Sequence, residues 1–196
     1  NGQSDDSLGR RVVARDLTFN RLIATTSSRD AVEFARAFAE GHLEAPRVLV
    51  LAGSAGVGKT CLIRAIARAG TRNGRVVLTT ATQLADLLIL AIRSDSIELL
   101  RRWYIRGDLL LVEDLHTLSS RRATQEQLAL HVRTWIDAGV RVVMTAGGPI
   151  DDLAAFVRGL PAAPTSRTVF LRRPGRRDMR AIVLAMAKRS GVRLNW

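Results

Sequence analysis

The chain has 196 residues, of which 47% are hydrophobic, enough for one folded domain with a sizeable core. A single cysteine excludes an internal disulfide, and neither a secretory signal nor an apolar run of membrane-spanning length occurs, so we expect a cytoplasmic protein. Thirty basic residues against 18 acidic ones give a net charge of +12, which favours a polyanionic partner.

In chain order, we expect a flexible leader over residues 1–10 and one domain over residues 11–196. Residues 30–40 read as an amphipathic helix. Five short apolar runs rich in valine and leucine are typical of strands that are buried on both faces, and they are 47–52, 75–80, 108–113, 141–146 and 168–171. Helical patterns alternate with these runs, so we predict an α/β fold, a five-stranded parallel sheet flanked by helices in three layers.

Two helical patterns, 82–93 and 95–106, separate the second and third predicted strands, where a minimal fold needs one. Capping-box spacing predicts where three helices begin. The pairs with this spacing are Thr80 and Gln83, Asp95 and Glu98, and Thr124 and Gln127.

The segment after the first predicted strand reads G-x-x-x-x-G-K-T and opens a helical pattern, which is the setting of a phosphate-binding loop. Its glycines let successive backbone N–H groups point at phosphate oxygens, and the helix N-terminus adds further donors. Lys59 would reach the β- and γ-phosphates, and the Thr60 hydroxyl would ligate Mg²⁺. The candidate nucleotide-binding residues here are Gly53, Ser54, Ala55, Gly56, Val57, Gly58, Lys59, Thr60 and Cys61.

The third predicted strand ends in two carboxylates, Glu113 and Asp114. Beside a phosphate loop, one such acid normally holds the water shell of Mg²⁺ while the other polarises the attacking water. The alternative is a strand that simply ends in solvent.

Arginine dominates the C-terminal part of the chain. From Arg158 onward the sequence has ten basic residues and one acid, Asp178. This block predicts contact with nucleic acid or with an acidic protein surface, although solvated helix faces would account for single arginines. Trp103 and Tyr104 lie beside three arginines and could stack on the bases of single-stranded DNA, or Trp103 could anchor its helix to the core.

Several segments, in order, resemble the AAA+ domain family of the bacterial replication initiator DnaA, from Leu17 to about Leu194. They are T-F-N-R-L-I at 18–23, the phosphate loop, D-L-L-L-V-E-D-L-H at 108–116, A-T-Q-E-Q-L at 123–128, V-V-M-T at 142–145 and R-D-M-R-A-I-V at 177–183.

This resemblance implies a P-loop AAA+ fold that binds ATP or ADP with Mg²⁺. It implies that Ile23 and Ala24 line the adenine pocket, that Thr60 and Glu113 serve the metal, and that Asp114 acts on the water. Thr145 would lie on the sensing strand behind the γ-phosphate, and Arg158 would be an inter-subunit or phosphate-sensing residue. The pair of helices before the third strand resembles the insertion with which this family forms filaments and touches DNA. The implied partners are DNA, further copies of the chain or a replication protein.

The sequence departs from the family pattern at three places. Glu113 stands where the family has aspartate, Ala146 and Gly147 replace a polar pair, and Ala162 stands where a trans-acting arginine finger is usual. The similarity ends before the lid and the helix-turn-helix domain of the family, so we expect either a fragment or a protein that lacks both.

We therefore expect an assembly module that binds ATP and hydrolyses it slowly. The alternative is a non-hydrolysing regulatory protein that keeps ATP or ADP as a structural ligand. A small-molecule P-loop kinase is disfavoured, because the sequence contains no arginine-rich lid.

Overall fold

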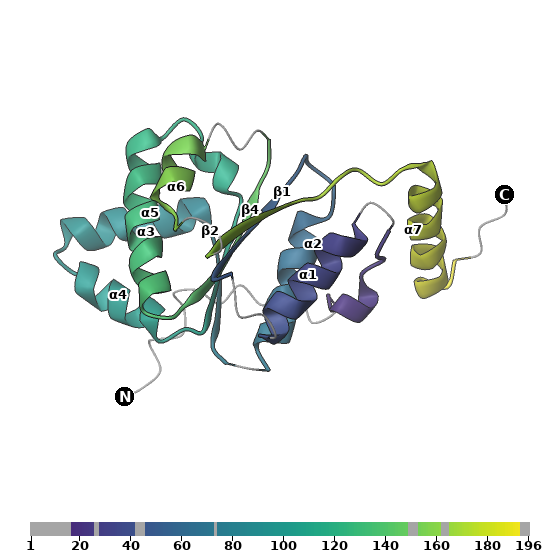
Figure 1. The fold of residues 1–196 in the computed structure, drawn as a ribbon, viewed down its shortest axis with the longest axis horizontal. Helices are drawn as coiled ribbons and strands as arrows, with labels where there is room; N and C mark the ends of the chain where they lie inside the picture. Colours follow the sequence, from purple (N-terminus) through teal and green to yellow (C-terminus); the bar gives the residue numbers. More distant parts are fainter. Residues whose placement is uncertain are drawn as a thin grey trace.

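The computed structural model describes residues 17–25, 28–41, 46–72, 74–148, 153–161 and 165–192, so the expected leader lies outside the described residues. Five parallel strands form one sheet in the order β2-β3-β4-β1-β5 (Figure 1). They are β1 (Val48–Ala52), β2 (Val76–Thr80), β3 (Leu109–Glu113), β4 (Arg141–Ala146) and β5 (Ser166–Phe170). The predicted fold class and number of strands are confirmed.

Alternation along the central strands builds two cores, because successive side chains of a strand point to opposite faces. Leu109 and Leu111 of β3 pack into one cluster, whereas Leu110 and Val112 pack into the other. β5 differs, because as an edge strand it is largely exposed, with 64% of Phe170 accessible. The prediction that all five strands are buried on both faces is wrong for β5.

Helices cover both faces of the sheet (Figure 1). One layer consists of α1 (Arg29–Glu40) and α2 (Lys59–Gly70), with the short 3-10 helix η1 (Phe19–Arg21) beside it. The other layer consists of α3 (Ala81–Arg93), α4 (Ile97–Ile105), η2 (Leu115–Leu118), α5 (Arg122–Asp137) and α6 (Ala154–Gly159). The last helix, α7 (Arg176–Arg189), has no buried residue and projects from the body beyond β5.

The helical pair between β2 and β3 is confirmed as α3 and α4. Tyr104 is 2% exposed and stacks on Trp135, so the prediction that it stacks on nucleobases is wrong. Trp103 packs partly against the core, with its ring edge-on to Tyr104 and under the Arg75 guanidinium at 4.6 Å. The alternative, that Trp103 anchors its helix, is therefore the correct one.

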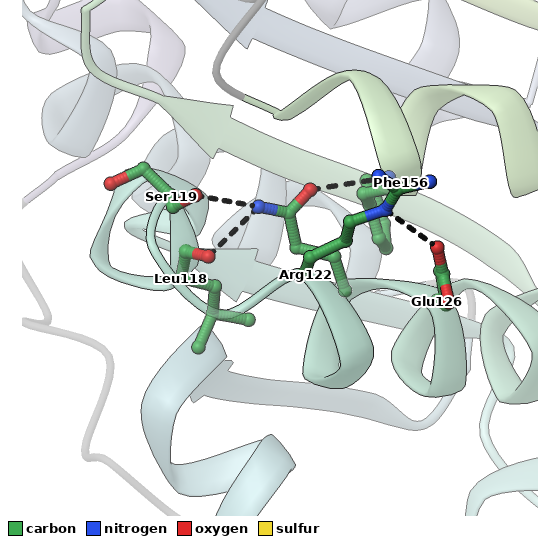
Figure 2. A network of polar contacts seen from close by, with 6 residues as sticks. Leu118, Ser119, Arg122, Glu126 and Phe156 are labelled. Carbon is green, nitrogen blue, oxygen red and sulfur yellow. Dashed lines mark hydrogen bonds and ion pairs between the residues drawn. The ribbon is translucent and has the colours of Figure 1, made fainter.

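A buried glutamine joins three segments beyond β3. Gln125 of α5 donates from Nε2 to the carbonyl oxygens of Leu118 (2.8 Å) and Ser119 (3.1 Å), and its Oε1 accepts from the Phe156 N–H at 3.3 Å. Figure 2 shows these three bonds beside the exposed Arg122–Glu126 ion pair. Gln125 thereby links the turn that follows the acidic pair to α6, which carries Arg158.

Candidate nucleotide site

The phosphate loop connects the buried strand β1 to the first turn of α2, as the sequence predicts. Gly56 and Gly58 have positive φ angles of 78° and 100°, a region that side-chain-bearing residues rarely adopt. Gly53 also has a positive φ angle (153°), and it allows a close approach as well, because a Cβ atom there would lie 2.5 Å from the Leu171 carbonyl oxygen. The bend after β1 therefore depends on glycine at three positions.

Lys59 is fixed against this loop. Its Nζ donates to the carbonyl oxygens of Gly53 (2.7 Å) and Ser54 (2.9 Å), and 9% of the residue is exposed. Burial lowers the pKa of the Lys59 ammonium, and the Asp114 carboxylate acts in the opposite direction. The loop thus holds a cation that is poorly solvated and suited to meet an anion.

A cavity of about 610 Å³ opens between the loop and the ends of β3 and β4. One side is lined by the loop and the start of α2, and the other by the segments after β3 and β4. The lining residues are Ala55, Gly56, Gly58, Lys59, Thr60, Cys61, Asp114, His116, Gly147 and Gly148. Six of the nine loop residues singled out from the sequence therefore meet at one cavity, with Asp114 opposite them.

The end of β3 is held by Thr145 of β4. Asp114 has a left-handed backbone (φ 62°), and its N–H donates to Thr145 Oγ1 at 2.9 Å. Its carbonyl oxygen accepts from the Thr117 hydroxyl at 2.8 Å. Thr145 is 1% exposed and does not line the cavity, so its visible contact is with the Asp114 backbone.

Glu113 is 3% exposed and does not itself line the cavity. Its Oε1 is 3.8 Å from Arg64 Nε, one helical turn beyond Thr60 on α2. Within the described residues, no cluster of three or more His, Cys, Asp or Glu side chains could hold a metal ion. Mg²⁺ bound with a nucleotide needs only one or two protein oxygens besides phosphate and water, so Thr60 and the carboxylates beside it fit such an ion.

A second cavity of about 320 Å³ adjoins the first and shares Gly56, Gly58 and Cys61 with it. Its walls are mainly apolar, and η1, α1, α2, the segment after β5 and α7 contribute to them. Ile23 is half-buried and lines this cavity, whereas Ala24 is exposed and does not. Ile182 and Met186 of α7 line it as well, and Arg189 of α7 donates to the Arg21 carbonyl oxygen.

Of the remaining candidates, Arg158 lines neither cavity. Arg158 is exposed on α6, and Ala162 lies outside the described residues. Sequence reasoning gave no role to Arg64 or to the walls formed by α7.

Comparison with known proteins identifies the family. The model of the bacterial DnaA ATPase domain matches residues 13–160. The chain belongs to this family. It is 35% identical to the chromosomal replication initiator protein DnaA of Rippkaea orientalis over 132 residues, which are 66% of this chain and 29% of that protein. The chain thus spans less than a third of the length of this curated DnaA protein.

Solved DnaA structures share the fold. AMPPCP-bound DnaA from Aquifex aeolicus superposes with a TM-score of 0.77 at 21% identity, over 94% of this chain and 58% of that one. Replication initiator DnaA bound to AMPPCP and single-stranded DNA gives a TM-score of 0.76 at 20% identity, with the same coverage of 94% and 58%. No helix in the described part of this DnaA-family domain is long and apolar enough to cross a membrane.

Proposed function

We propose that the two adjoining cavities bind one adenine nucleotide, with the phosphates in the larger cavity and the base in the smaller one. The observation that carries this proposal is their junction at the phosphate loop, where Gly56, Gly58 and Cys61 line both. The polar end has the Lys59 ammonium, and the other end has apolar side chains such as Ile23, Val57 and Leu62. This polarity matches a molecule with a charged tail and a flat aromatic head.

Each residue then has a defined task. The amides of the loop and of the first turn of α2 donate to phosphate oxygens, and Lys59 neutralises them. Thr60 and Glu113 would hold Mg²⁺, which offsets phosphate charge when bound. Asp114 is the only carboxylate among the described residues that line the larger cavity, so it orients the attacking water.

We propose that hydrolysis is slow. Thr145 uses its hydroxyl on the Asp114 backbone and not on the cavity, and Ala162 provides no guanidinium where the family places a finger. Arginine fingers accelerate hydrolysis by about 10³- to 10⁵-fold where they act. In this proposal the bound nucleotide controls assembly with further copies, or with a replication protein, through the exposed Arg158 on α6.

DNA is the proposed polyanionic partner. A related structure is described as DnaA bound to single-stranded DNA, and the relatives are named replication initiators. In this chain, five exposed arginines cluster in sequence at the start of α7 and just before it, namely Arg172, Arg173, Arg176, Arg177 and Arg180. Binding through these arginines would weaken steeply as salt rises, whereas salt-independent binding would contradict it.

Calorimetry with ATP, ADP and GTP, with and without Mg²⁺, tests nucleotide binding. We expect the adenine nucleotides to bind and the Lys59→Ala variant to lose most of that affinity. The chain offers a matched control, because its only other lysine, Lys188, is exposed on α7 and lines neither cavity. Absence of binding by the parent chain, or equal losses in Lys59→Ala and Lys188→Ala, would refute the proposal.

A non-hydrolysing regulator is the second candidate, and the buried Thr145 hydroxyl favours it. A phosphate-release assay with and without DNA separates the two. If the parent chain releases phosphate slowly and Asp114→Asn abolishes this release, the ATPase is supported. Tight nucleotide binding without any release in either condition supports the regulator.

A further inference from the structure

His116 is a ring on the wall of the larger cavity that the proposed function leaves unused. It belongs to η2, two residues beyond Asp114, and it lines the same cavity as Lys59. Its Nδ1 accepts a hydrogen bond from the Gly147 N–H at 3.2 Å. This bond joins the segments that follow β3 and β4, two neighbouring strands of the sheet.

The bond with Gly147 fixes the tautomer of the ring. A nitrogen that accepts a hydrogen bond carries no proton, so the neutral imidazole of His116 has its N–H at Nε2. Among the described residues, Nε2 has no hydrogen-bond partner. Of the described side chains that the segments after β3 and β4 contribute to the cavity, His116 is the only one that provides an N–H donor.

Glycine at position 147 makes this arrangement possible. A Cβ atom there would lie 3.0 Å from Nδ1, 3.2 Å from Cε1 and 3.3 Å from Cγ of His116, closer than ordinary contact. Any larger residue at this position would displace the ring. Gly147 also replaces one residue of the polar pair that is usual in the family. The imidazole of His116 therefore lies where a side chain at position 147 would begin.

We propose that His116 donates from Nε2 to the terminal phosphate and so distinguishes a nucleoside triphosphate from a diphosphate. This inference rests on the proposed nucleotide site. Lys59, Asp114 and His116 line the same cavity. With Lys59 on the β- and γ-phosphates, the third phosphoryl group is the one that would come nearest to Asp114 and His116. His116 thus supplies the contact that Ala146 and Gly147 lack.

Paired titrations of ADP and of a non-hydrolysable ATP analogue on the whole chain test the inference. A hydrogen bond to a charged phosphate corresponds to about tenfold in affinity. His116→Phe keeps the ring but removes both nitrogens, so we expect about tenfold weaker binding of the analogue with ADP affinity unchanged. His116→Gln retains an acceptor and a donor in one side chain and should recover most of the loss.

Gly147→Ala provides a second, independent variant, because its methyl group displaces the ring without altering it. We expect the analogue-to-ADP preference to fall in this variant too. An unchanged preference in His116→Phe, while ADP still binds, overturns the inference and leaves the proposed function intact. Loss of ADP binding by the parent chain would instead overturn the proposed function. A parallel loss of both ligands in His116→Phe, with unaltered melting, also overturns the role in discrimination.

Discussion

Replacing Gln125 with leucine is the sharpest test of how the site is supported. The side chain is 2% exposed and serves three backbone groups, the carbonyl oxygens of Leu118 and Ser119 and the N–H of Phe156. Leucine has a similar volume but no polar atom, so the variant leaves these groups without this partner. The substitution therefore isolates hydrogen bonding from packing.

The expected magnitude follows from these bonds. Each buried backbone group that loses its partner costs about 1 kcal/mol, so three give about 3 kcal/mol. Burying the extra apolar surface of leucine returns about 1 kcal/mol. We therefore expect Gln125→Leu to lower the free energy of unfolding by about 2 kcal/mol and the melting temperature by about 4–8 °C.

Urea denaturation followed by circular dichroism measures this change. Glu126→Ala is the matched control, because it removes the adjacent exposed ion pair with Arg122 (3.1 Å) and should cost less than about 0.5 kcal/mol. If Gln125→Leu unfolds at the urea concentration of the parent chain, the three bonds do not stabilise the fold and the reasoning fails.

Three further variants test other contacts. A double-mutant cycle of Arg64→Leu and Glu113→Gln, in the same denaturation assay, should give a coupling of about 1–2 kcal/mol, and additive effects would exclude a stabilising pair. Gly53→Ala should destabilise by at least about 2 kcal/mol, since its Cβ would meet the Leu171 carbonyl oxygen, and a parent-like melting curve would contradict this. Burial lowers the pKa of His131 below its ordinary value of 6.5, so the folded state favours the neutral side chain. Its contribution to stability is therefore fully present above about pH 6.5 and is lost as the pH falls. The parent should lose more stability than His131→Leu as the pH falls below about 6.5, and equal pH profiles would refute this.

Capping-box spacing predicted one of three helix starts correctly. The capping box at Thr80 is confirmed, with both reciprocal bonds to Gln83 at 3.2 and 3.3 Å. The same spacing failed at Asp95, which has a left-handed backbone (φ 51°) and leaves Ser96 to precede α4. It failed at Thr124 as well, because α5 begins two residues earlier. Spacing alone does not fix the backbone angles on which a cap depends.

Sequence patterns did not predict which residues contact one another across the sheet. The two acids after β3 look equivalent in sequence, but strand alternation directs Glu113 toward Arg64 on α2 while Asp114 lines the cavity. The bond between His116 and Gly147 spans 31 positions and exists because β3 and β4 are neighbours. A single sequence shows which residue types are present, whereas the order of the strands decides which of them meet.

The position of α7 leads to the last prediction. This helix has no buried residue, and three of its residues, Ile182, Met186 and Arg189, line the smaller cavity. A base in that cavity would cover apolar surface of α7, so ADP should slow tryptic cleavage within the arginine-rich segment 176–189. Pyrophosphate occupies only the phosphate loop and should not. If pyrophosphate protects α7 as well as ADP does, or ADP binds without protecting it, the base does not contact this helix and the smaller cavity is not its site.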